Sequence, residues 1–565
     1  MTNNIKELGS FYTKDKTTFR VYAPYSDSVS LVLDDKSYPM AKRDETFTLE
    51  VCGDLEKHLY HFENEKGSFI DPFAYANTLD NNNSIILDTD KFIKETVTPK
   101  ERNSTSIYEI SIRDFTSSPV YNGNYKGKFL ALTETGLKYD GRSIGLDYLK
   151  ELGISHLQIM PIFDFDDDEK DDSGYNWGYN PLSYSSLKYD YAKDPSNPYN
   201  LVNEFRKTVN VLHENDIRVT LDVVFNHVYN TELFALEKML SGHAFRRKED
   251  GTLANGSLCG NELMSEDPFI RAYLVELCER FVKTYDIDGL RFDIMGLIDV
   301  DTMNAIRDRL VSIKKDILIY GEGWTMGEAL KDEEKASLYN LEKMPGISSF
   351  NPFFKDIVIS YACGNEGLRN EVKDVFNGYN EGNMPFSQSI NYVECHDNYT
   401  FFDRINFSNE EFEAKKRRSK LALAFTILSR GTPFIHSGEE FLRTKHGIEN
   451  SYNASDEINM LDWRRMTEFP DMVEFVKGLL KIREKYADNF LEEANVYDYY
   501  EVIVFEYRDL KIFFNPCQYD HVSNDGYIYK MIFDGYSLRE NDEGIISIPA
   551  YGVVILDKSE QYLYV

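Results

Sequence analysis

Three acidic residues stand where the sequence predicts the ends of strands, and together they could cleave a glycosidic bond. Such cleavage needs one carboxylate to attack or stabilise the anomeric carbon and one carboxylic acid to protonate the leaving oxygen. Asp293 follows the segment Gly289–Phe292, and Glu322 follows the apolar segment Ile317–Tyr320. We predict that these two residues form the catalytic group with Asp397, which would stabilise an oxocarbenium-like transition state.

The side chains beside these acids could tune their chemistry. Arg291 lies two residues before Asp293 on an extended strand, so both should face the same side, and the guanidinium should favour an ionised Asp293. Burial beside Trp324 could raise the pKa of Glu322 into the range of a general acid. His396 could help to hold sugar hydroxyls. Each residue alone could equally be a cap or an ion-pair partner, but the ordered set favours catalysis.

The elements that must position these residues follow a regular order. From Ile107 onward, short apolar strands alternate with amphipathic helices, which predicts a parallel sheet with helices outside. One such helix should begin at the cap pair Asp267-Pro268. About eight strands are expected, which suits a (β/α)8 (TIM) barrel. They should begin near Ile107, Leu157, Val219, Gly289, Ile317, Ile347, Ile390 and Pro433.

Segments rich in β-type alternation on both sides of this region predict a multidomain chain. Thr18–Tyr22 and Val29–Leu33 indicate an N-terminal β-sandwich, and Val502–Phe505 and Tyr551–Leu556 indicate a C-terminal one. The expected domains are residues 1–100 for the first sandwich, 101–489 for the catalytic barrel and 490–565 for the second sandwich.

The composition of the chain excludes some classes of partner and indicates the cell compartment in which the protein works. A formal charge of -32 disfavours nucleic acid and anionic membranes as partners, although solubility alone also explains it. The six cysteines form no C-x-x-C pair, and we expect reduced thiols. The chain starts without an export-signal pattern and has no bilayer-length apolar segment, which predicts a cytoplasmic enzyme. The acidic run Asp164–Asp172 should be a solvated loop.

Four polar segments, taken in order, resemble the four signature regions of the α-amylase superfamily of glycoside hydrolases, glycoside hydrolase family 13. The resemblance covers most of Ile107–Phe490 and implies a retaining mechanism. By it, Asp293 is the nucleophile, Glu322 the general acid/base and Asp397 the transition-state stabiliser. It also implies that Arg291, His227 and His396 line the subsite of the attacked glucose. The segments are Asp222–His227, Arg291–Asp293, Gly321–Trp324 and Glu394–Asn398.

A seven-residue segment indicates which group of this superfamily the chain resembles most. Residues 175–181 resemble the YNWGYNP signature of type I pullulanases, which remove α-1,6 branches from pullulan, limit dextrins and related glucans. Its rings offer flat apolar faces to glucose, and its Asn side chains offer hydrogen bonds. A packed aromatic loop would explain one or two of these rings but hardly the whole heptad. We expect Tyr179 to stack on the glucose at the cleavage site, with Trp177 also binding substrate.

Other segments extend this resemblance. Ser451–Asp456 looks like the pullulanase version of a later motif, and Phe19–Pro24 resembles the starch-binding-type module that precedes the barrel of debranching enzymes. Tyr22 stands where tryptophan is common in that module, which leaves open whether the module binds glucan or only packs on the barrel. The further substrate-binding residues expected from the resemblance are Trp324, Asn453 and Asp456.

The expected partner is an α-glucan such as pullulan, branched dextrin or glycogen. No cofactor is expected to be required. Calcium binding near Asn226 stays open, because no regular cluster of oxygen ligands appears in the sequence. Two alternatives remain: an isoamylase-like or neopullulanase-like hydrolase of the same superfamily, and a non-catalytic glucan-binding protein. The heptad argues against the first, and the presence of all three carboxylates argues against the second.

Overall fold

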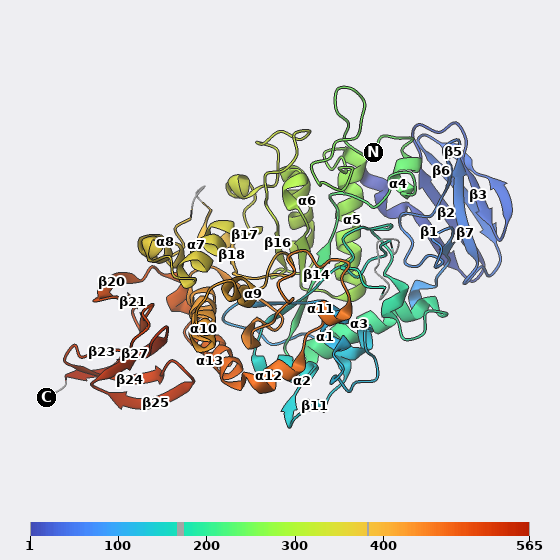
Figure 1. Cartoon of the computed structure of the whole chain (residues 1–565). Helices are drawn as coiled ribbons and strands as arrows, with labels where there is room; N and C mark the ends of the chain where they lie inside the picture. The colour runs from blue at the N-terminus through green and yellow to red at the C-terminus, as the bar shows by residue number, and fades with distance from the viewer. Residues whose placement is uncertain (1, 167–173, 381–383, 564–565) are drawn as a thin grey trace.

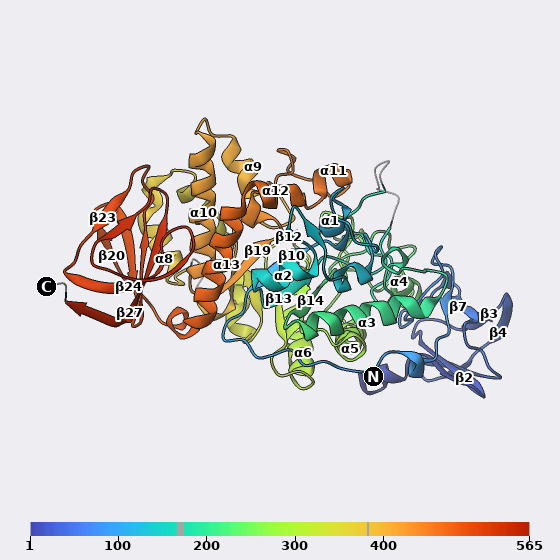
Figure 2. The ribbon, with the colours of Figure 1, turned by 90° about the horizontal axis from the view of Figure 1, so that it is seen from below.

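Three parts of the molecule lie in a row in the computed structural model, which describes residues 2–166, 174–380 and 384–563 (Figure 1). The N-terminal strands occupy one end, a barrel the middle and the C-terminal strands the other end, and Figure 2 shows the same order from below. The predicted multidomain fold is confirmed. Residues 167–172 of the predicted acidic loop Asp164–Asp172 lie outside the described residues.

Eight parallel strands close into a barrel. The first and last strands pair directly, with Ile107 opposite Phe434. All eight strands begin within one residue of the positions expected from the sequence, so the (β/α)8 prediction is confirmed. The strands are β10 (Ile107–Ile110), β13 (His156–Ile159), β14 (Arg218–Val223), β15 (Gly289–Phe292), β16 (Leu318–Gly321), β17 (Ser348–Phe350), β18 (Ser389–Asn391) and β19 (Thr432–His436).

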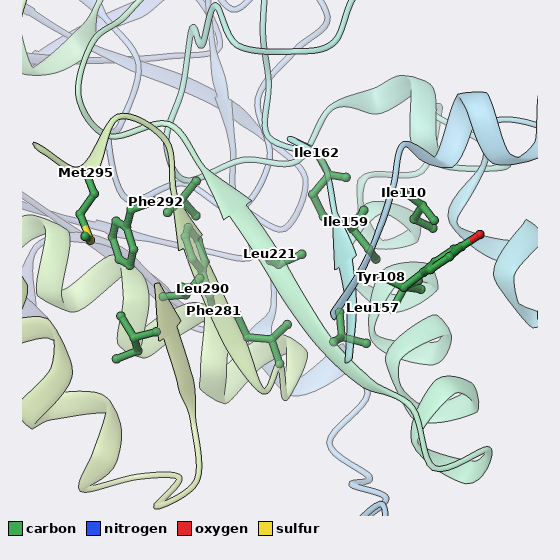
Figure 3. Close-up of a cluster of buried hydrophobic side chains, with 14 of the residues drawn as sticks. Tyr108, Ile110, Leu157, Ile159, Ile162, Leu221, Phe281, Leu290, Phe292 and Met295 are labelled. Carbon is green, nitrogen blue, oxygen red and sulfur yellow. The ribbon is translucent and has the colours of Figure 1, made fainter. Parts of the chain in front are cut away.

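Alternation along these strands creates an apolar outer layer and a partly polar interior. Outward-facing residues such as Leu221 and Leu290 pack with Phe281 of helix α5 (Pro268–Tyr285) (Figure 3). The interior holds an apolar cluster that includes Tyr320 and Phe350. The register of the strands places buried polar residues opposite one another: Glu109 pairs with Gln158, and Asp222 pairs with Arg291. This polar set lies near the C-terminal ends of the strands, where barrels of this type place their active sites.

The helices surround the barrel. The α5 helix begins at the predicted cap: the Asp267 side chain accepts from the N–H groups of Phe269 and Ile270, and Pro268 occupies the first turn. The other long helices are α3 (Pro198–Glu214), α6 (Val300–Val311), α7 (Pro352–Ala362), α8 (Arg369–Phe376), α10 (Phe412–Leu428) and α13 (Pro470–Lys485). The shorter ones are α1 (Ile112–Ser117), α2 (Leu146–Leu152), α4 (Ala235–Met239), α9 (Phe401–Asn406), α11 (Asp456–Asn459) and α12 (Trp463–Glu468).

Two antiparallel sheets form the predicted N-terminal sandwich. Phe19 and Val21 are buried from alternate positions of one strand. Tyr22 on the same strand stacks on Phe269 of α5, with ring centroids 4.4 Å apart, so it packs against the barrel. One sheet contains β1 (Gly9–Thr13), β2 (Lys16–Tyr22), β5 (Ala41–Arg43) and β6 (Thr46–Cys52); the other contains β3 (Ser30–Leu33), β4 (Lys36–Pro39), β7 (Leu59–Asn64), β8 (Gly67–Phe69) and β9 (Ser84–Ile85).

The C-terminal part is a six-stranded sheet with a smaller two-stranded sheet, as the sequence predicts. Its Phe505 lies 3.8 Å from Phe376 of α8 between ring centroids, and its Phe514 stacks on Phe425 of α10 at 4.3 Å. The large sheet contains β20 (Asn495–Tyr499), β21 (Val502–Glu506), β22 (Leu510–Phe514), β24 (Tyr527–Phe533), β25 (Leu538–Glu543) and β27 (Val553–Leu563); the small one contains β23 (His521–Ser523) and β26 (Ile546–Ile548).

The domain borders at residues 100 and 489 stay predictions.

In the part of the chain that the structure describes, no helix has both the length and the apolar character needed to cross a membrane.

Candidate active site

One buried arginine bonds to three carboxylates at the C-terminal ends of β14, β15 and β16. Arg291, only 1% exposed, donates from Nη1 to Asp222 Oδ1 (2.9 Å) and Asp293 Oδ1 (3.1 Å). Its Nη2 lies 2.6 Å from Glu322 Oε1. Asp293 and Arg291 therefore face the same side, as their spacing predicts, and a single guanidinium brings the two candidate reacting acids together.

Asp293 is fixed from a second direction by Asn226. The Asn226 Nδ2 group donates to both the backbone oxygen and the Oδ2 atom of Asp293, each at 2.8 Å. In the sequence alone, Asn226 could equally be a turn residue. With Arg291 on Oδ1 and Asn226 on Oδ2, both carboxylate oxygens of Asp293 accept hydrogen bonds, which hold the side chain in one orientation.

Glu322 lies in a buried environment that shifts its pKa. Burial raises its pKa to about 7; the charge of Arg291 opposes this shift, and the negative charges of Asp293 and Asp397 add to it. The backbone N–H of Ile294 donates to Glu322 Oε2 at 3.1 Å. The raised pKa agrees with the expectation from the sequence, although neighbouring carboxylates contribute to it along with burial. Glu322 can therefore carry a proton near neutral pH.

Asp397 occupies the solvent side of the same group. Its side chain is 49% exposed, and Oδ2 lies 3.9 Å from His396 Nε2. Its charge contributes to the raised pKa of Glu322, so the two side chains interact across the site. Asn398, which follows, has a left-handed backbone (φ 63) that turns the chain after β18. Arg291 thus joins Asp293 to Glu322, and the charge of Asp397 acts on Glu322 from the solvent side.

The heptad loop covers this group with aromatic rings. The Tyr179 ring stacks on His396 with centroids 5.0 Å apart, and its hydroxyl donates to Asp222 Oδ2 at 2.7 Å. The Trp177 ring meets His396 edge-on at 5.0 Å, and its backbone N–H donates to Tyr452. Asp222 lies within its strand and anchors Arg291 and Tyr179, in line with the structural role that its position in the strand favours.

Two further predicted site residues, His227 and Trp324, lie in different surroundings. His227 is buried behind the heptad, with Nδ1 2.6 Å from Asn226 Oδ1 and Nε2 2.8 Å from the backbone oxygen of Tyr179, and burial lowers its pKa. Trp324 is half-buried against the apolar cluster of the barrel interior.

Asn453 and Asp456 belong to the segment behind the heptad. Asp456 accepts two hydrogen bonds from Arg113, at 2.7 and 2.9 Å, and Arg113 also donates to the backbone oxygen of Gly174 just before the heptad. Asn453 is half-buried in the turn before α11. Arg113 thus links Asp456 to the loop that carries Tyr179. Arg291, by contrast, links Asp222, Asp293 and Glu322 to one another.

Sequence reasoning missed one buried acid in this site. Glu109 of β10 accepts from the backbone N–H of His396 at 2.8 Å and from Gln158 Nε2 at 2.9 Å. The only sequence signal was a glutamate inside the apolar strand Ile107–Ile110. Among the residues that the structure describes, no three His, Cys, Asp or Glu side chains gather as a metal-ion site, and the question of calcium stays open.

Comparison with known proteins agrees with this geometry. The family "Alpha amylase, catalytic domain" matches residues 138–250 and 252–466, and "Carbohydrate-binding module 48 (Isoamylase N-terminal domain)" matches residues 7–74. Pullulanase of Bacillus subtilis is 37% identical over 521 residues, which cover 86% of this chain and 72% of the relative. The chain belongs to the α-amylase family and, within it, to the pullulanases. It is an α-1,6 debranching glycoside hydrolase.

Solved pullulanase structures share the whole architecture. Pullulanase of Anoxybacillus sp. LM18-11, complexed with maltotetraose, superposes with a TM-score of 0.92 at 32% identity and covers 98% of this chain and 87% of its own. Apo pullulanase of Paenibacillus barengoltzii gives a TM-score of 0.91 and covers 98% and 95%. Pullulanase 1 of Arabidopsis thaliana is 29% identical, and the match spans about half of that protein (47%). The isoamylase-like, neopullulanase-like and non-catalytic alternatives are not favoured.

Proposed function

We propose that the chain hydrolyses α-1,6 branch linkages with retention of configuration, using Asp293 as nucleophile and Glu322 as acid/base. The observation that carries this assignment is the bonding of both carboxylates to Arg291, with Asp293 hydrogen-bonded on both oxygens and Glu322 buried with a raised pKa. A retaining glycosidase needs two neighbouring carboxyl groups, one positioned to attack and one able to carry a proton near neutral pH.

The reaction proceeds in two steps. The Asp293 carboxylate attacks the anomeric carbon while the bond to O6 of the leaving chain breaks, and Glu322 gives its proton to that oxygen. Asp397 stabilises the positive charge that develops on the sugar ring. Glu322, now ionised, takes a proton from water, which attacks the anomeric carbon and releases Asp293. Two inversions give net retention.

Binding of the glucan falls to the residues around these acids. Tyr179 and Trp177 would present ring surface to the attacked glucose, and His396, which contacts both rings, would line the same position. His227, assigned to this subsite by the resemblance, would act on it through its contact with the backbone oxygen of Tyr179. Trp324 would flank the leaving sugar, and Asn453 and Asp456 would support or contact the chain beside the heptad. A cavity of about 1020 Å³ is lined by Arg247, Asn255, Leu258, Met326 and other residues, of which Met326 belongs to the loop after Trp324.

We infer that pullulan, branched dextrins and glycogen-type glucans are substrates, and the cytoplasmic location stays a prediction. The bond specificity can be read from the products of pullulan. We expect maltotriose, because the heptad at residues 175–181 resembles the signature of type I pullulanases. Chromatography of a complete digest gives the result, and panose as the main product would contradict it. Binding of pullulan without any product from a folded sample would favour a non-catalytic protein.

The raised pKa of Glu322 predicts the alkaline limb of the pH–rate profile. A general acid must be protonated to work, so kcat/KM on pullulan should fall as the pH rises through about 7. Initial rates at subsaturating pullulan measure this limb. A limb at the ordinary pKa of glutamic acid, or none up to strongly alkaline pH, would contradict the assignment of Glu322.

A further inference from the structure

Glu109 is a buried carboxylate that the reaction described above does not use. It is 1% exposed on β10, and its Oε1 atom lies 2.8 Å from His396 Nδ1 while Oε2 accepts the backbone N–H of His396 at 2.8 Å. Gln158 donates to Oε1 as well, at 2.9 Å. Both oxygens of Glu109 are thus directed to the segment that carries Asp397.

We propose that Glu109 is a positioning residue that keeps His396 doubly protonated, so that its Nε2–H donates to a hydroxyl of the bound glucan. A neutral imidazole with its proton on Nδ1 would leave Nε2 as an acceptor only. With both nitrogens protonated, Nδ1–H is held by Glu109, and Nε2–H, which lies 3.9 Å from Asp397 Oδ2, can donate to the sugar. The proposal rests on the assignment of His396 to the sugar site.

The charges around His396 support a charged ring. Burial alone would lower the pKa of His396, but the negative charges of Glu109 and Asp397 outweigh burial and the opposing Arg291, and the pKa is raised to about 9. The pKa of Glu109 is lowered in spite of its burial, chiefly by His396. The other groups that face His396 are Lys445, which donates to its backbone oxygen at 2.9 Å, Tyr179, which stacks on the ring, and the nearby Asp222 and His436.

A second histidine in the barrel shows that a carboxylate partner does not suffice by itself. His436 Nδ1 lies 2.7 Å from Glu394 Oε1. Burial and the positive charges of Arg443, Lys445 and His396 nevertheless lower the pKa of His436 well below its usual value. Burial raises the pKa of Glu394 to about 8. This neutral pair is an internal control for the charged pair of Glu109 and His396.

Binding and titration can be measured without turnover in a Glu322→Gln background, which also removes the titration of Glu322. Maltotetraose affinity is measured by calorimetry from neutral to alkaline pH, and the histidine ring resonances are followed by NMR, with His396 assigned from a His396→Gln variant. We expect affinity to stay constant until the pH nears 9. Adding Glu109→Gln should move the loss of affinity and the His396 titration at least one unit lower, about a tenfold effect on affinity at the shifted pH.

Controls separate positioning from a general structural effect. Glu50→Gln removes an exposed carboxylate paired with Lys16 and should change neither curve. Glu109→Asp keeps the charge and should restore the high titration of His396 in part, and the resonance of His436 should not move. An unchanged His396 titration in Glu109→Gln, or an equal loss of affinity at every pH, would overturn the proposal.

Two further outcomes keep the test decisive. If Glu109→Gln does not fold, a His396 resonance that titrates below neutral pH in the parent protein overturns the proposal without any Glu109 variant. If maltotetraose fails to bind at any pH, the proposed function is at fault, while the His396 titration still decides the role of Glu109.

Discussion

An Asp293→Asn variant is expected to lose kcat by several orders of magnitude while keeping its fold. The amide cannot attack the anomeric carbon, yet it can still accept from Arg291 and occupy the same volume. The loss should be equally large for pullulan and for α-maltotriosyl fluoride, because both require the nucleophile. Steady-state rates with both substrates test this expectation, and the thermal midpoint reports the fold.

The matched control for this variant is Asp301→Asn, which removes a carboxylate that is 80% exposed at the start of α6. It should leave kcat unchanged. Activity of Asp293→Asn within about tenfold of the parent would remove Asp293 from the role of nucleophile.

A Glu322→Gln variant is expected to show a loss that depends on the leaving group. Release of O6 of a sugar needs a proton in the transition state, so pullulan turnover should fall by several orders of magnitude. Fluoride leaves without protonation, so formation of the glycosyl-enzyme from α-maltotriosyl fluoride should be largely retained. The burst of released fluoride measures this step, and the fall in rate near pH 7 should vanish with the titrating group.

The contrast with Asp293→Asn makes this result diagnostic. If Glu322→Gln slowed release of fluoride as much as hydrolysis of pullulan, Glu322 would not be the proton donor. A parent-like rate on pullulan would contradict the assignment equally.

The sequence was most informative where a pattern has a local physical cause. Most barrel strands lie in short, mainly apolar runs, and the cap at Asp267 is a local hydrogen-bond motif, so both were predictable. The side chains of Arg291 and Asp293 lie on the same side of the strand, as their two-residue spacing on an extended strand predicts.

The contacts that the sequence did not predict depend on how strands far apart in the sequence pair with one another. Glu109 contacts His396 across 287 positions of sequence, and Gln158 reaches Glu109 only because β10 and β13 pair in one register. The role of Asn226 likewise depends on β14 and β15 being neighbours. A single sequence carries no direct signal for such contacts, apart from a charged residue inside an apolar strand.

The aromatic contacts at the two ends of the barrel limit how the chain could be shortened. Removing the last strands at the predicted border would leave Phe376 and Phe425 without Phe505 and Phe514, and removing the first sandwich would uncover Phe269. The barrel without its flanks would present these rings to water and become prone to self-association. A minimal catalytic fragment would therefore need polar replacements at these positions.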